Sequence, residues 1–402
     1  MATMDEEESS FTLPLIEDDE NKQALVTKLE EIEPNSSHSC STTNSFFKTC
    51  FNGLNALSGV GILSTPYALA SGGWLSLILL FAIATAAFFS GLLIQRCMDS
   101  DSNIRTYPDI GELAFGKKGR LIVSIFMYIE LYLVATGFLI LEGDNLQNLF
   151  PNMEFEVGQG LTIGGKQGFI IIVSLIILPT VWLDNLSLLS YVSASGVLAS
   201  GIILGSIIWT GAFEGIGFQQ KGTLVNWDGM LTAISLYAFC YCAHPVFPTL
   251  YTSMKKKHQF SNVTLNLPAS KISSKVAIYT TLVNPIAKYA LMVTPIVNAI
   301  KTRFSCRYNP RFLSILIGTN LLISTVLVAL AIPFFGSMMS LVGSLLSITA
   351  SVILPCLCYL KISGIYRRLN GQLVGICLII IVGVCLVIFG TYISVLDIIG
   401  NF

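Results

Sequence analysis

The chain has 402 residues, of which 53% are hydrophobic and 12% are charged, and its mean hydropathy is +0.71. This composition is typical of a polytopic membrane protein and excludes a single water-surrounded core for most of the chain. The formal net charge is −1, but residues 1–44 carry eleven Asp and Glu against two Lys, which leaves about +8 on the remainder.

The first segment, residues 1–44, is acidic and rich in Ser, Asn and Thr. It cannot bury enough apolar surface to order, so we expect a flexible cytosolic tail whose partner would be a sorting or regulatory protein. Leu15-Ile16 is similar to a dileucine sorting signal but lacks the usual upstream acidic residue, so chance is the simpler explanation. No basic stretch precedes a short apolar one, so the first span is expected to act as the insertion signal.

The rest of the chain consists of apolar segments of about twenty residues, the length that a membrane-spanning helix needs. We therefore predict an all-α polytopic membrane protein with ten spans in a transmembrane domain over residues 45–402. The predicted spans are 46–70, 74–96, 120–148, 168–183, 188–212, 230–252, 276–300, 311–335, 338–360 and 373–396.

The first span contains Gly59, Gly61 and Pro66 within eight residues, and these are poor helix formers. Because lipid offers no replacement hydrogen bonds, we expect two half-helices around an unwound turn that lines a cavity. The freed amides, carbonyls and helix ends of such a turn suit a carboxylate, an ammonium group or a small cation. The alternative is a kinked packing helix whose glycines only let a neighbour approach.

The sixth span contains a second candidate break at Tyr237–Pro248, where Pro245 and Pro248 remove amide donors. Breaks in spans one and six are what a five-plus-five inverted repeat predicts, with the two broken helices facing each other near the bilayer midplane. Aromatic residues beside the second break would then wall a substrate pocket. A proline kink at a helix interface is the alternative.

Two ionisable residues are predicted to lie at membrane depth, where a charge is costly and is usually paired or functional. Glu130 is ten residues beyond Arg120, about 15 Å into its helix. It is the proton-relay candidate. Lys288 follows a third predicted distortion at Asn284-Pro285 and is a candidate partner for such a carboxylate. A structural ion pair or snorkelling would explain both residues equally well.

Two further carboxylates, Glu142 and Asp144, lie nearer the outer end of the same span, where we expect them to be solvated. His244 follows the second break and is expected to be a hydrogen-bonded packing residue rather than a proton carrier.

Basic residues in the connections give the orientation, because basic loops stay on the cytoplasmic side. The loop between spans two and three is rich in Lys and Arg, which predicts a cytosolic N-terminus, and the first six spans obey the rule. The rule then fails, since seven later basic residues fall on the far side. They are Lys301, Arg303, Arg307, Arg311, Lys361, Arg367 and Arg368.

One additional crossing between Lys257 and Lys275 would return all seven to the cytoplasm. The segment 263–274 is too short and too polar to be that crossing. We therefore predict that one spanning helix is absent here from an otherwise eleven-span design.

Signals for an enzyme are absent from the sequence. It contains no Gly-rich phosphate loop, no nucleophile elbow and only three His, and its ten Cys lack the spacing of a zinc site. We expect no enzymatic activity, no metal and no cofactor other than a coupling ion.

Three stretches are similar to one known family: Ser58–Ala68 (SGVGILSTPYA), Thr106–Gly111 (TYPDIG) and Thr281–Tyr289 (TLVNPIAKY). Together they resemble the amino acid/auxin permease family, specifically its plant vacuolar amino acid transporters, over about residues 45–402. The resemblance implies a secondary transporter with eleven spans in a LeuT-like inverted-repeat arrangement, generally proton-coupled in the vacuolar group.

The resemblance also implies site residues. The unwound turn of the first span would meet the carboxylate and amine of an amino acid, and the second break would shape the pocket for its side chain. The implied contacts are Gly59, Val60, Gly61, Ile62 and Leu63 at the first break and Tyr237, Phe239, Cys240 and Tyr241 at the second.

The chain departs from the family pattern after the Lys255–Lys257 run. The family has its seventh span there, whereas here Asn262-Val263 leads directly into a stretch that resembles the luminal loop before the eighth. We expect a proton-coupled amino acid transporter of an endomembrane, with the vacuolar membrane first and the plasma membrane as the alternative. A transport-incompetent isoform or a non-transporting nutrient receptor is the rival interpretation.

Overall fold

The computed structural model describes most of the chain after the acidic tail. The described residues are 46–57, 60–157, 161–183, 186–213, 222–241, 243–253, 283–304, 309–332, 335–367 and 370–401. The predicted tail and the segment of the missing helix therefore lie outside the described residues.

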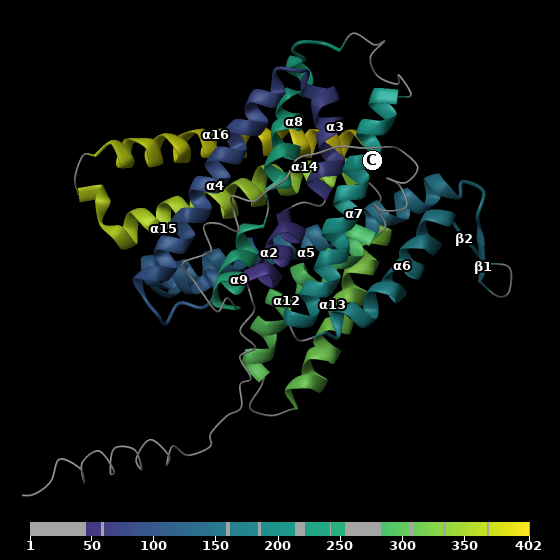
Figure 1. Ribbon diagram of the computed structural model, residues 1–402, viewed down its shortest axis with the longest axis horizontal. Helices are drawn as coiled ribbons and strands as arrows, with labels where there is room; N and C mark the ends of the chain where they lie inside the picture. The colour runs from purple at the N-terminus through teal and green to yellow at the C-terminus, as the bar shows by residue number, and fades with distance from the viewer. Residues whose placement is uncertain are drawn as a thin grey trace, which may run out of the picture. The chain divides into compact units, whose positions relative to one another are not determined.

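The described chain is almost entirely helical, as Figure 1 shows. Its first half comprises α2 (Phe46–Leu57), α3 (Val60–Gly72), α4 (Ser76–Ser100), α5 (Tyr107–Leu149), α6 (Gly165–Val181) and α7 (Leu186–Phe213). A short antiparallel hairpin, β1 (Phe155–Val157) with β2 (Leu161–Ile163), interrupts the loop before α6, and it pairs Phe155 with Ile163.

The second half of the described chain is also helical. It comprises α8 (Trp227–Cys240), the 3-10 turn η1 (His244–Val246), α9 (Phe247–Ser253), α12 (Val283–Phe304), α13 (Pro310–Ala331), α14 (Phe335–Leu341), the π-helical segments η3 (Val342–Ser347) and η4 (Thr349–Ile353), α15 (Leu354–Ser363), the 3-10 turn η5 (Ile365–Arg367) and α16 (Gly371–Asn401).

Each of the ten predicted spans coincides with a helix or a run of helices, which confirms the all-α polytopic architecture. Six of these runs are individually long and apolar enough to cross a membrane, as counted over the described residues. They are Ser76–Ser100, Tyr107–Leu149, Trp227–Ser253, Pro310–Ala331, Phe335–Ser363 and Gly371–Gly400.

The first span comprises α2 and α3, which lie on either side of residues 58–59, and these two residues lie outside the described residues. Of the predicted unwound turn at Gly59–Leu63, residues 60–63 are helical, so an unwound turn at residues 58–59 stays a prediction. The assignment of Pro66 as a helix break was wrong: it lies inside α3, where a proline removes one hydrogen bond but leaves the rest of the helix in place.

The sixth span is divided, because α8 ends at Cys240 and the chain turns through η1 before α9. Pro245 lies in the first turn of η1, and Pro248 is the second residue of α9, where the missing N–H has no intrahelical partner to lose. Asn284 and Pro285 lie at the start of the described part of α12, directly after residues outside the description, so the predicted distortion there stays a prediction.

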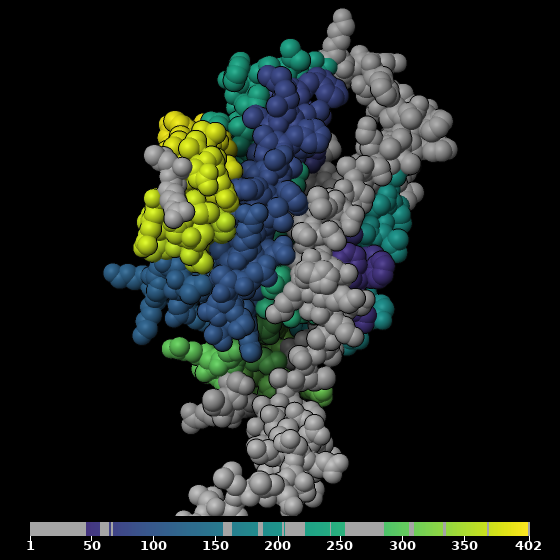
Figure 2. Space-filling model, turned by 60° about the vertical axis from the view of Figure 1, so that its left-hand side comes forward, coloured from purple at the N-terminus to yellow at the C-terminus, as the bar shows by residue number. Residues whose placement is uncertain are grey.

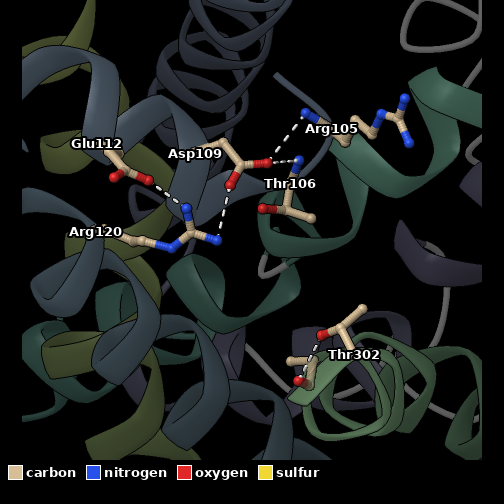
Figure 3. Close-up of polar contacts among 7 residues, drawn as sticks. Arg105, Thr106, Asp109, Glu112, Arg120 and Thr302 are labelled. Carbon is tan, nitrogen blue, oxygen red and sulfur yellow. Dashed lines mark hydrogen bonds and ion pairs between the residues drawn. The ribbon is translucent and has the colours of Figure 1, made fainter. Parts of the chain in front are cut away.

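Helix α5 begins at Tyr107, before the predicted third span, because it joins two helices across a kink at Gly116. Gly116 bends it with φ of 67° and ψ of −159°, a conformation that glycine adopts without a Cβ penalty. Figure 3 shows how the bend is held: the Asp109 carboxylate accepts from the backbone N–H of Thr106 at 2.8 Å and pairs with Arg120 at 3.2 Å. Arg120 also pairs with Glu112.

The first and sixth spans pack against each other in the interior. In Figure 1, α3 lies beside α8, and the contacts along the two helices confirm this pairing. The segment η3 covers another side of α8, where a Cβ added at Gly343 would overlap the carbonyl of Ser235. The C-terminal helices α15 and α16, yellow in Figure 2, lie outside this layer, and α15 packs on α4.

Candidate functional site

The beginning of the described part of α3 lies level with the break at the end of α8. Cys240, the last residue of α8, has its Sγ 3.7 Å from the Ser64 hydroxyl and 4.0 Å from the Thr65 hydroxyl, near the start of α3. At the opposite end of the pair, a Cβ built on Gly72 would lie 2.8 Å from that of Ala233. The two helices are therefore antiparallel, and the start of α3 faces the end of α8.

The end of α8 is a helix C-terminus within the described chain. The carbonyls of its last turn have no further helical turn to supply donors, because the chain leaves the helix at Tyr241. Helix C-termini favour cations. This end of α8, beside Ser64 and Thr65 of α3, is the candidate site.

The residues predicted to contact substrate are placed as follows. Val60, Gly61, Ile62 and Leu63 are the first described residues of α3, directly after residues 58–59, which lie outside the described residues. Cys240 and Tyr241 end α8 at the second break and are half-buried.

The two aromatic residues of the last turn of α8, Tyr237 and Phe239, are buried. Tyr237 is 0% exposed, and its hydroxyl forms a hydrogen bond of 2.9 Å with Ser76 of α4. Phe239 is likewise buried. Tyr237 therefore anchors α8 to α4, and its hydroxyl is already engaged.

The second break is fixed by hydrogen bonds to two neighbouring elements. The carbonyl of Tyr241 lies 3.2 Å from Nδ1 of His244 and accepts from the Ser351 hydroxyl in η4 at 3.4 Å. The Nε2 of His244 lies 2.9 Å from the Ala87 carbonyl and 3.1 Å from the Ser90 hydroxyl, both in α4. His244 is buried and serves to hold the break against α4.

Glu130 is 0% exposed in the middle of α5. Neither of its carboxyl oxygens has a hydrogen-bond partner within the described part of the chain. The Ser347 hydroxyl of η3 faces the carboxyl but lies outside hydrogen-bonding geometry. The adjoining segment η4 is tied to α5 by the Tyr107 hydroxyl, which donates to the Ala350 carbonyl at 2.6 Å. Glu130 is thus a buried carboxyl against a π-helical segment, a type of distortion that is frequent at functional sites.

Lys288 is 2% exposed and lies on α12, whereas Glu130 lies on α5. Its Nζ donates to the carbonyl of Ala56 at 3.4 Å, in the last turn of α2. The predicted pairing of Lys288 with the carboxylate of Glu130 was therefore wrong, since both oxygens of Glu130 lie without such a partner. The prediction failed because the two side chains lie on different faces of their helices. Lys288 projects from α12 towards α2, whereas Glu130 projects from α5 towards η3.

The carbonyl end of α2 is the centre of a three-helix junction. Nδ2 of Asn55 donates to the Ala287 carbonyl of α12 at 3.2 Å and to the Ser193 hydroxyl of α7 at 3.3 Å. Gly196 of α7 lies against the same group, and a Cβ there would be 2.9 Å from that of Ala287 and would overlap the Asn55 amide. The sequence analysis did not find Asn55, because one asparagine among apolar residues carries no periodic signal.

A second carboxyl of α5 was misplaced by the sequence analysis. Glu142 was expected to be solvated, but it is 0% exposed, and neither oxygen has a hydrogen-bond partner among the described residues. Asp144, two residues later, forms an ion pair of 2.5 Å with the ammonium of Lys166, which lies in the first turn of α6. Within the described residues no cluster of His, Cys, Asp or Glu is arranged to hold a metal ion.

The junction at Gly196 gives a direct mutational test. We expect Gly196→Ala to force α7 away from α2 and α12 and to destabilise the folded protein by about 1–3 kcal/mol, as overpacking does. Gly201→Ala, on the same helix with open space around it, is the matched control and should be neutral. Thermal unfolding of both variants in detergent measures the difference; equal midpoints would show that the junction is loosely packed.

Comparison with known sequences identifies relatives of this chain. The sequence pattern of the family described as "Transmembrane amino acid transporter protein" matches residues 42–264 and again 260–396. Amino acid transporter AVT1I of Arabidopsis thaliana is 58% identical over 391 residues, covering 89% of this chain and 96% of the relative. Amino acid transporter AVT1J of the same plant is 59% identical over 391 residues, covering 89% and 92%.

A more distant relative comes from an animal. The vesicular GABA transporter of Caenorhabditis elegans is 24% identical over 426 residues, covering 92% of this chain and 84% of its own. The alignment to AVT1I is 391 positions long. It includes 89% of the 402 residues of this chain, which is about 358 residues. About 33 aligned positions of AVT1I therefore have no counterpart in this chain. The family match is divided at residues 260–264.

Proposed function

This chain belongs to the family of transmembrane amino acid transporters, a family of carriers and not of enzymes, and we propose that it is a proton-coupled secondary transporter of neutral amino acids in an endomembrane. The observation that carries the proposal is the antiparallel pairing of α3 with α8, where Cys240 at the end of α8 faces Ser64 of α3.

The predicted unwound turn at residues 58–59 would complete a site for an amino acid zwitterion. The α-carboxylate would lie at the amides of residues 60–63, because a helix N-terminus stabilises an anion. The ammonium group would meet carbonyls at the ends of α2 and α8. The substrate side chain would then extend towards Cys240 and Tyr241, which border the break in the sixth span. The predicted break in span one, opposite the break in span six, is the basis for proposing a LeuT-like inverted repeat.

Glu130 is the proposed carrier of the coupling proton. A buried carboxyl without a hydrogen-bonded counter-ion is stable when it is protonated and costly when it is charged. Release of its proton would therefore require water to reach the site, as happens when a transporter opens to one side. Lys288 is the proposed second coupling residue, through its contact with the end of α2.

The vacuolar membrane is the proposed location, with a cytosolic N-terminus. The resemblance to plant vacuolar transporters and the basic loop between α4 and α5 support these two assignments. The plasma membrane is the alternative location.

We also propose that this form lacks the seventh helix of the family. Three observations support it: the basic residues that fall on the wrong side, the division of the family match at 260–264, and the roughly 33 unmatched alignment positions. One span plus a short loop requires about thirty residues.

The role of Glu130 is tested by replacing its titratable group. In proteoliposomes with an imposed pH gradient, Glu130→Gln should lower gradient-driven uptake of radiolabelled neutral amino acids by about tenfold or more, because the amide carries no exchangeable proton charge. Glu154→Gln, at an exposed position, is the control and should transport normally. Full pH-dependent uptake by Glu130→Gln would remove this residue from the mechanism. Substrate binding without translocation by the unmodified chain would instead favour a non-transporting receptor.

The missing helix is tested by restoring it. A chimaera that carries the corresponding residues of AVT1I between Asn262 and Val263 should show severalfold faster uptake than the unmodified chain, because it regains the full span count. A control insert of the same length made of Gly and Ser should give no gain. Uptake that is equal in all three proteins would mean that the described helices suffice for transport.

A further inference from the structure

The bend of α5 lies at the edge of the membrane-spanning part of this helix. Beyond the bend, large apolar side chains are exposed at Leu121, Ile122, Ile125 and Ile129. Residues three and four apart share one face of an α-helix, so these side chains form a continuous stripe. On a membrane-spanning helix such a stripe faces lipid. The stripe starts five residues after Gly116, so the bilayer surface lies close to the bend.

Two lysines continue this stripe past its end. Lys117 and Lys118 lie four residues before Leu121 and Ile122, on the same face of the helix and one turn nearer the bend. Both side chains are exposed. A lysine in this position lays its methylene stem along apolar surface and extends its ammonium to the level of the lipid headgroups.

Large apolar side chains are exposed on the other side of the bend as well. Leu113 and Phe115, directly before Gly116, are 44% and 48% exposed. Exposed apolar residues next to lysines are typical of a segment that lies in the membrane interface, because the interface accommodates both.

The two arms of the bend are in backbone contact. A Cβ added at Gly119 would overlap the carbonyl of Gly111, and one added at Gly111 would lie 2.7 Å from the carbonyl oxygen of Gly119. Gly116 turns the chain between these arms with a φ of 67°. The lysines that follow Gly116 are therefore carried on a closely packed bend.

The carboxylates of the bend are already engaged. Asp109 and Glu112 are the only acidic residues between positions 107 and 120, and both pair with Arg120, as Figure 3 shows. The ion pairs found among the described residues include neither Lys117 nor Lys118. The two ammonium groups are thus available to an anion from outside the chain.

We propose that the bend of α5 binds an anionic phospholipid. The ammonium groups of Lys117 and Lys118 hold the charged headgroup, and an acyl chain lies along the stripe that starts at Leu121. Charge and shape favour this occupant, because a headgroup phosphate suits two unpaired lysines and a lipid chain suits the apolar face directly below them. The site concerns the membrane around the protein and is independent of the transported substrate.

The first experiment measures lipid binding and needs no transport. Native mass spectrometry of the purified full-length chain in detergent compares dioleoyl phosphatidylserine with dioleoyl phosphatidylcholine, which has the same acyl chains. The unmodified protein should bind one phosphatidylserine about tenfold more tightly. Lys117→Gln/Lys118→Gln should abolish this preference, because each lysine near the membrane surface adds attraction for an anionic headgroup.

The matched control is Lys361→Gln/Arg367→Gln, which removes two exposed charges that lie over the Tyr366 ring. It should keep the preference for phosphatidylserine. Equal affinity of the unmodified chain for the two lipids would overturn the proposal, and so would equal losses in the two double variants. Displacement of the lipid by glycerophosphoserine, the headgroup without acyl chains, would also overturn it, because the site would then be one for a free phosphate ester.

The second experiment places the bend relative to the bilayer surface. In a background where the four Trp are replaced by Phe, the Phe115→Trp protein is reconstituted in phosphatidylserine-containing vesicles. Its fluorescence should be quenched by lipids brominated near the headgroup end of their acyl chains and protected from iodide in the water. Strong quenching by iodide without quenching by brominated lipid would place the bend in water and contradict the proposal.

Discussion

The need to satisfy backbone polar groups away from water governs this structure. An unbroken helix meets that need internally, so a helix that ends inside the membrane domain must find partners elsewhere. Within the described residues α8 ends in this way at Cys240, and the surrounding helices hold its end. The neighbours supply donors, cations and small residues that let backbones approach.

The last described residues of α2 and the end of α8 are held by different neighbours. Asn55 and Lys288 join α2 to α7 and α12, whereas His244 and Ser351 join the end of α8 to α4 and η4. Helix α5 contacts both sets, because it packs against α12 and against η4.

The sequence was sufficient to locate the spans and the division of the sixth, because span length, hydropathy and clustered Gly and Pro are local signals. It was not sufficient to place side chains around each helix. Membrane helices such as α5 are apolar on all sides, so no periodicity indicates which face Glu130 or Glu142 occupies. The mistaken pairing of Lys288 with Glu130 has the same origin, since depth along the membrane normal was predictable but rotation was not. Pro66 was misjudged because a single proline does not end a helix whose neighbours pack tightly.

The most direct test of the account is whether the two breaks face each other across the substrate site. In a background where the other cysteines are replaced, Ser64→Cys should form a disulfide with native Cys240 under mild oxidation, since the present Oγ and Sγ lie 3.7 Å apart. The account predicts that the cross-link blocks amino acid uptake, that reduction restores it and that a transported amino acid slows its formation. Failure to cross-link, or full uptake by the cross-linked protein, would contradict the central claim.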